Sequence, residues 1–201
     1  MKIVTWNVNS INARIEHLTK FIQKDNSDIY LIQELKCIND TFPYEKLEKL
    51  GYNCYVNGQK AWNGVAIISK CKLKILNNKI PTFRDDSQSR FLETEIQLNK
   101  IKKPIKLFCI YLPNGNPIET EKFDYKIKWM KKFNEYIIKL YDKNNPIIIG
   151  GDFNVIPTDD DVYSPENFKH DACAHPKTRE QYRILINKGF TDTVKFFLDG
   201  K

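Results

Sequence analysis

The chain has 201 residues, 41% hydrophobic and 28% charged, with 32 Lys and Arg against 25 Asp and Glu. This length supports one large domain with a hydrophobic core, and the lack of long Ser/Gly/Pro tracts or like-charge blocks excludes extended disorder. The apolar runs are strand-sized and residues 1–6 do not resemble a signal peptide. We therefore expect a soluble, cytoplasmic protein with no membrane contact.

The net charge of +7 suits a polyanionic partner without requiring one, because Lys and Asn are abundant throughout. The five cysteines are scattered, odd in number and form no C-x-x-C pair. This pattern argues against a disulfide framework and against a zinc site.

Two strands near the N-terminus are predicted to end in polar residues. Residues 2–9 read as a strand that contains Asn7, and residues 28–34 as a buried strand that ends in Glu34. Either Ser10 or Asn12 is a candidate cap for the intervening helix. Its apolar face, at helical spacing, is Ile15, Leu18, Phe21 and Ile22.

The sequence of residues 52–98 is mainly typical of β-strands. Residues 64–69 are predicted to form a core strand, and the alternating pattern of residues 91–98 predicts a half-exposed strand. Residues 104–112 form a further strand that ends near Tyr111.

Three further helices are predicted. They cover residues 43–50, residues 121–141, which show the clearest apolar stripe, and about residues 179–188.

Residues 146–149 form a β-branched run typical of a strand buried on both faces. Two glycines end the run, and Asp152 and Asn154 follow. A polar site at the carboxyl end of the strand and a simple turn are both compatible with this pattern. Residues 159–161 are interpreted as loop and cap residues.

These elements favour an α/β fold, with two packed mixed β-sheets flanked by helices in a single domain over residues 1–201. Polar groups stand at four strand ends, at Asn7, Glu34, Tyr111 and the Asp152/Asn154 pair. If they converge, their oxygens suit Mg²⁺ or Mn²⁺ and the hydrolysis of a phosphodiester.

Four ordered motifs carry a family resemblance, at residues 5–9, 31–36, 111–115 and 150–157. The chain resembles the exonuclease III family of AP endonucleases, bacterial branch, within the endonuclease/exonuclease/phosphatase superfamily. The resemblance implies a DNase I-like four-layer α/β sandwich. It also implies a Mg²⁺-dependent DNA-repair nuclease that cuts 5′ to abasic sites and trims 3′ ends.

The resemblance also implies residue roles. Glu34 is the main metal ligand, with Asn7 beside it, and Asp152 and Asn154 complete the metal and phosphate site. Asp152 positions or deprotonates the attacking water, Asn154 holds the scissile phosphate, and Tyr111 contacts the phosphate or the leaving group.

Four residues are candidate DNA contacts: Lys36, Lys60, Arg90 and Asn114. For the two lysines and the arginine, the alternative is an ordinary charged side chain exposed to solvent. The implied partner is double-stranded DNA with abasic sites or 3′ ends. We expect a monomer that associates with the nucleoid when it acts on DNA.

Family members continue past residues 191–193 into a Trp-rich loop, an Arg-Ile-Asp strand and a Ser-Asp-His motif, none of which occurs in these 201 residues. The expectation is therefore a C-terminally truncated domain that lacks the last strands and has impaired activity. Two alternatives stay open: a phosphatase of the same superfamily that acts on small phosphorylated molecules, and a non-catalytic DNA-binding remnant.

Overall fold

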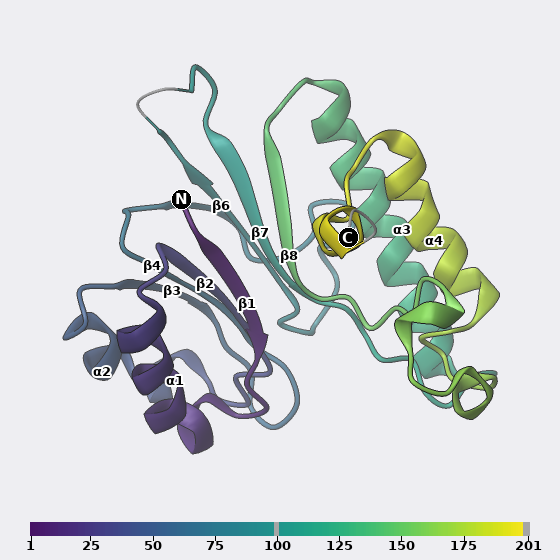
Figure 1. The fold of residues 1–201 in the computed structure, drawn as a ribbon, viewed down its shortest axis with the longest axis horizontal. Helices are drawn as coiled ribbons and strands as arrows, with labels where there is room; N and C mark the ends of the chain where they lie inside the picture. Colours follow the sequence, from purple (N-terminus) through teal and green to yellow (C-terminus); the bar gives the residue numbers. More distant parts are fainter. Residues whose placement is uncertain (99–100, 199–201) are drawn as a thin grey trace. The chain divides into compact units, whose positions relative to one another are not determined.

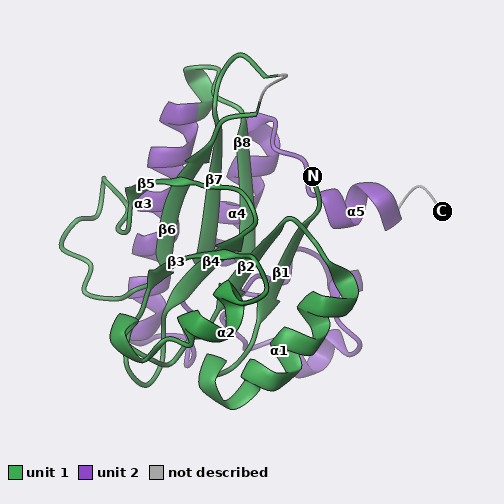
Figure 2. Ribbon diagram, turned by 90° about the vertical axis from the view of Figure 1, so that its left-hand side faces the viewer, with its two compact units in different colours: residues 1–112, 141–153 green, residues 113–140, 154–201 purple. Residues whose placement is uncertain are grey.

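The computed structural model describes residues 1–98 and 101–198 (Figure 1). It divides into two compact units, one of residues 1–112 and 141–153 and the other of residues 113–140 and 154–201 (Figure 2). The expectation of a single domain stays a prediction. Among the described residues, no helix is both long and apolar enough to cross a membrane.

The first unit contains two mixed four-stranded sheets. The first has the order β1-β2-β4-β3 and is built from β1 (Ile3–Asn7), β2 (Ile29–Gln33), β4 (Val65–Ser69) and β3 (Asn53–Asn57). The second has the order β5-β6-β7-β8 and is built from β5 (Lys74–Asn77), β6 (Phe91–Ile96), β7 (Ile105–Tyr111) and β8 (Ile147–Asp152). β1 and β2 run parallel, as do β7 and β8, and the other neighbours are antiparallel.

An apolar layer joins the two sheets. It is made of Ile29, Leu31, Val65 and Ile67 from the first sheet and Leu92, Ile96, Ile105, Leu107 and Cys109 from the second. The alternate residues of β2 and β4 face outward, against α1 (Ile11–Asp25) and α2 (Tyr44–Glu48). Successive side chains of a strand point to opposite faces, so β2 and β4 are buried on both sides, as their apolar sequences predict.

The cap of α1 is Ser10, whose hydroxyl accepts the Ala13 N–H. The buried face of this helix differs from the prediction at one position. Ile15, Leu18 and Ile22 are buried, and Phe21 is 37% exposed. A short 3₁₀ turn, η1 (Asn39–Thr41), precedes α2.

Helices dominate the second unit. They are α3 (Glu121–Asp142), which ends within the first unit, α4 (Pro176–Lys188), α5 (Thr193–Leu198) and the 3₁₀ turns η2 (Asp159–Asp161) and η3 (Pro165–Phe168). A buried hydrogen bond of 2.9 Å from the Asn134 amide to the Gln181 carbonyl links α3 to α4. α4 begins three residues before the predicted start, because His175 caps it and Pro176 suits its first turn.

Two burial predictions are wrong. β6 is not half-exposed, because Glu93 is fully buried, 3.5 Å from the Lys106 ammonium, and accepts the Asn77 amide. β8 is only half-buried, because it is an edge strand of the described sheet.

We predict that Gly151→Ala destabilises the protein more than Gly51→Ala. At Gly151, a Cβ would lie 2.0 Å from the carbonyl oxygen of Ile110 on the paired strand. Overpacking against backbone should lower the free energy of unfolding by about 3 kcal/mol. Gly51 also has a positive φ, of 85°, but no atom lies within 4 Å, so strain alone should cost about 1 kcal/mol. Urea unfolding measures both values, and equal losses would contradict the close approach.

Candidate active site

Polar side chains from both sheets meet at the carboxyl ends of four strands. Asn7 ends β1, Glu34 follows β2, Tyr111 ends β7 and Asp152 ends β8. Parallel pairing sets Tyr111 opposite Asp152 and Asn7 opposite Gln33, so both pairs of strands end at matched positions. The structure thus brings together four of the residues that the sequence proposes for the site.

Asn7 connects the two carboxylates. Its Nδ2 donates 2.8 Å hydrogen bonds to Glu34 Oε1 and to Asp152 Oδ2. Its Oδ1 accepts the N–H of Asn9 at 3.1 Å. Asn7 therefore holds two negative groups from different sheets side by side through its nitrogen, and its predicted role as a metal ligand stays a prediction.

Glu34 is kept in its charged form. Burial raises the pKa of this carboxyl, but hydrogen bonds from Asn7, Lys36 and Tyr111 together outweigh burial and leave the pKa below its ordinary value of 4.5. The Lys36 ammonium lies 3.0 Å from Oε2, and the Tyr111 hydroxyl donates to Oε1 at 2.9 Å. Lys36 thus balances the charge of Glu34, and its predicted contact with DNA stays a prediction.

The backbone of Glu34 has a φ of 56°, in the left-handed region that side chains other than glycine seldom adopt. Such a conformation costs about 1–3 kcal/mol and requires support from its surroundings. The Glu34 carbonyl accepts the Ser10 N–H at 2.8 Å, and the next N–H, of Leu35, donates to the Gly64 carbonyl at 3.1 Å. Two neighbouring loops therefore hold Glu34 in a strained conformation that aims its carboxylate at the site.

Tyr111 is a hydrogen-bond donor throughout the neutral pH range. Burial, followed by the hydrogen bond to Glu34, raises the pKa of its hydroxyl to about 12. Arg90 lies over the Tyr111 ring, 4.6 Å from its centroid, and donates to the Tyr111 carbonyl at 3.2 Å. Arg90 therefore fixes this tyrosine, and its predicted contact with DNA also stays a prediction.

The remaining predicted residues are Asn114, Asn154 and Lys60. Asn114 and Asn154 belong to the second unit, where Asn114 Nδ2 donates to Asn154 Oδ1 at 3.3 Å. Asn154 has a φ of 44°, so it is a second candidate residue in the left-handed region. Lys60 is exposed in the loop between β3 and β4.

Sequence reasoning missed Lys126 on α3. This lysine is fully buried in the second unit, and its ammonium donates to three backbone carbonyls. The signal was present in the spacing, because Lys126 follows Phe123 by three residues and precedes Met130 by four, which places it on the apolar face of the helix.

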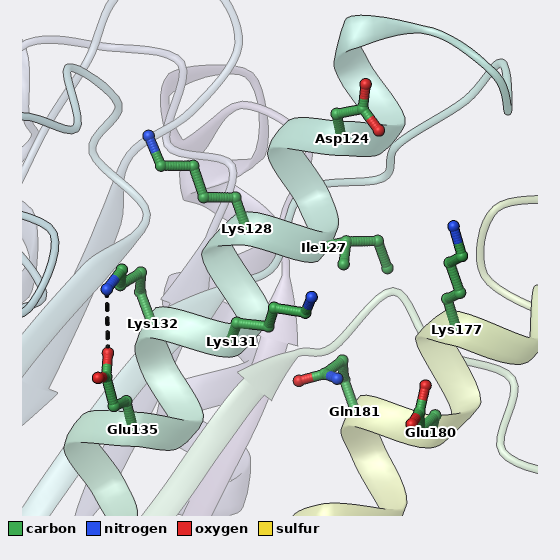
Figure 3. Close-up of a pocket in the computed structure, with 9 residues that line it drawn as sticks. All are labelled: Asp124, Ile127, Lys128, Lys131, Lys132, Glu135, Lys177, Glu180 and Gln181. Atoms are coloured by element: carbon green, nitrogen blue, oxygen red, sulfur yellow. Dashed lines mark hydrogen bonds and ion pairs between the residues drawn. The ribbon is translucent and has the colours of Figure 1, made fainter.

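A groove of about 670 Å³ lies between α3 and α4 in the second unit (Figure 3). Lys131 and Lys177 line it together with Glu180, while Lys132 is paired with Glu135 at 3.1 Å. Its charges are mixed, and none of its lining residues is a predicted site residue. The groove is therefore not the candidate active site.

The donor set at the strand ends fits a hard divalent cation. Mg²⁺ is commonly held by one or two carboxylates and completes its shell with water and substrate phosphate, and Glu34 and Asp152 are two such carboxylates. Among residues 1–98 and 101–198, no group of three or more His, Cys, Asp or Glu is arranged to hold a metal ion. Near η2, Asp161 accepts hydrogen bonds from Thr158 and pairs with Lys195 at 3.0 Å, which agrees with a capping role.

Residues 4–198 match the family described as Endonuclease/Exonuclease/phosphatase. The chain belongs to this family. The match covers both units and every predicted site residue.

Relatives in this family share the fold and much of the length. Exodeoxyribonuclease III of Haemophilus influenzae is 34% identical over 206 residues, a match that covers 97% of this chain and 75% of that protein. The structure of the 3′ phosphatase NExo from Neisseria, bound to a product DNA hairpin, has a TM-score of 0.88 at 31% identity and covers 98% of this chain and 74% of that one. An AP endonuclease from Archaeoglobus fulgidus has a TM-score of 0.86 at 29% identity, over 96% of this chain and 73% of its own. These similarities confirm the fold class and the family resemblance.

We predict that Lys36→Met raises the pKa of Glu34. The substitution removes the ammonium 3.0 Å from Oε2 that favours the charged carboxylate. Because the folded pKa lies below the unfolded one, the stabilisation from this carboxylate is present above pH 4.5 and is lost as the pH falls through the folded value. The loss should therefore begin at higher pH in the variant. Carboxyl ¹³C NMR measures the pKa, and Lys60→Met, an exposed lysine, is the control that should leave it unchanged.

Proposed function

We propose that the protein is a metal-dependent DNA-repair phosphodiesterase that cuts the DNA backbone 5′ to abasic sites and trims 3′ ends. The observation that carries this proposal is the pair of carboxylates, Glu34 and Asp152, held by one amide next to the Tyr111 hydroxyl. The relatives described as exodeoxyribonuclease III, AP endonuclease and 3′ phosphatase support the substrate class.

Mg²⁺, or Mn²⁺ in its place, is the proposed cofactor, with Glu34 as main ligand and Asn7, Asp152 and Asn154 completing the set. When bound, the cation supplies positive charge that stabilises the phosphoryl oxygens and the leaving oxygen.

The protein's own groups handle the water and the phosphate. Asp152 orients the attacking water and accepts its proton, and the Asn7 amide keeps the Asp152 carboxylate in place for this step. Tyr111 keeps its proton at neutral pH and donates a hydrogen bond to the phosphate or the leaving oxygen. Asn154, two residues after Asp152, holds the scissile phosphate.

Double-stranded DNA is the proposed partner, bound by a monomer. Lys36, Lys60, Arg90 and Asn114 are the proposed contacts to the DNA backbone, and the net charge of +7 supports an electrostatic contribution to binding. We also propose that the two units work as one domain, since the family match spans both.

We predict that Asp152→Asn lowers kcat for nicking an abasic duplex by about 10²–10⁴-fold, because the proton acceptor is lost. Steady-state cleavage of a labelled duplex measures the change. Glu45→Gln, which alters an exposed carboxylate on α2 paired with Lys49, is the control and should retain full activity. Cleavage undiminished in Asp152→Asn would exclude the assignment. Release of phosphate from small phosphorylated molecules without any DNA cleavage would favour the phosphatase alternative. DNA binding without turnover of either substrate would favour a non-catalytic DNA-binding protein.

We predict that chelation with EDTA abolishes cleavage and that Mg²⁺ or Mn²⁺ restores it. Without the cation, Glu34 and Asp152 repel the phosphodiester and no positive charge offsets the developing negative charge. Nicking is followed during titration with each cation, with Ca²⁺ as a comparison of larger radius. Full activity in EDTA would exclude a metal-dependent reaction.

A further inference from the structure

Lys126 holds two separate segments of the second unit through backbone oxygens. Its ammonium donates to the carbonyls of Pro113 at 3.0 Å, Asn114 at 3.1 Å and Asn154 at 2.6 Å. A lysine ammonium has three N–H donors, so each of these carbonyls can receive one. The side chain is fully buried, where such charge-assisted hydrogen bonds are strong and a lost donor is costly.

The two segments carry two of the proposed functional asparagines. Residues 113–114 follow β7, which ends at Tyr111, and residue 154 follows β8, which ends at Asp152. The side chains of Asn114 and Asn154 also meet, at 3.3 Å, so the segments touch through side chains as well as through the shared ammonium. One buried cation thus sets the spacing of two loops that leave adjacent parallel strands.

Gly115 is fitted to the lysine stem. It has a φ of 86°, and a Cβ on it would lie 2.5 Å from Lys126 Cδ and 3.3 Å from the Cβ of Ala172. The stem has little room to retreat, because its ammonium is held at three points and the residue is fully buried. The loop backbone and the lysine therefore depend on each other's position.

We propose that Lys126 is a positioning residue for the phosphodiesterase reaction. Its ammonium holds the backbone at Asn114 and Asn154, and this keeps the Asn154 side chain in the orientation that the reaction requires. The proposal rests on the proposed function, and it assigns the lysine no contact with substrate. A purely structural lysine would contribute to stability and leave turnover unchanged.

Lys126→Met keeps the stem and removes the three donors. We expect kcat for nicking an abasic duplex to fall at least about tenfold while KM changes less than about threefold, because the orientation of a substrate-holding group is lost. Lys131→Met, an exposed lysine of the same helix, is the matched control and should leave both constants unchanged. Lys126→Arg, which retains a cation with donors, should recover part of kcat. A kcat within about twofold of wild type in folded Lys126→Met would overturn the proposal.

A double-mutant cycle tests whether Lys126 acts through Asn154. In an Asn154→Ala background, Lys126→Met should lower kcat by less than about twofold further, because the group that it positions is already absent. Persistence of the full loss in that background would overturn the proposed route.

Hydrogen exchange gives a readout that does not depend on catalysis. In Lys126→Met, amides of residues 114–116 and 154–156 should exchange at least about tenfold faster while those of α1 stay unchanged. Unchanged exchange in these segments, or equal acceleration throughout, would overturn the positioning role. If Lys126→Met does not fold, Gly115→Ala takes its place. This variant crowds the Lys126 side chain and leaves its three donors in place, and its kcat, KM and hydrogen exchange are judged by the same limits. If the wild-type protein does not cleave DNA, only the proposed function fails. Hydrogen exchange still decides whether Lys126 positions the two loops.

Discussion

The apolar layer between the two sheets is the constraint on which the candidate site depends. Residues such as Leu31 and Leu107 pack across this layer, so β2 and β7 are held face to face. Because β1 and β2 run parallel, and β7 and β8 do too, the packing brings four carboxyl ends to one edge of the first unit. A small shift of one sheet would separate Asn7 from Asp152, whose hydrogen bond joins the two sheets.

The carboxylates of Glu34 and Asp152, which accept hydrogen bonds from the same amide nitrogen, repel each other, and the surrounding groups offset that repulsion. Asn7 donates to both, and Lys36 and Tyr111 complete the shell of Glu34. The left-handed backbone at Glu34 is maintained by hydrogen bonds from neighbouring loops. Strain and like charge at one place agree with a site selected for chemistry rather than for stability, since both cost free energy and need support from elsewhere.

The second unit uses a different device. The loops at Asn114 and Asn154 are not held by the backbone hydrogen bonds of a β-sheet. Instead, the buried ammonium of Lys126 donates hydrogen bonds to both of their backbone carbonyls. Such a contact is local, directional and sensitive to a single substitution. It links the chain segments that leave β7 and β8 to one residue of α3, and this explains why a lysine occupies the apolar face of that helix.

Most of the strands and helices and the four polar strand ends followed from the sequence, whereas β3, β5 and α5 were not predicted as separate elements. Apolar periodicity defines elements such as α3, and Asp and Asn after a buried run mark the ends of strands. Burial was predicted less well, as at Glu93, because a charged residue enters a core only when its partner, here Lys106, arrives from another strand. Helical spacing places Lys126 on the apolar face of α3, but its burial also depends on the carbonyls of Pro113, Asn114 and Asn154, which lie 12 to 28 residues away in the sequence. Local pattern carries no information about the distance to those partners.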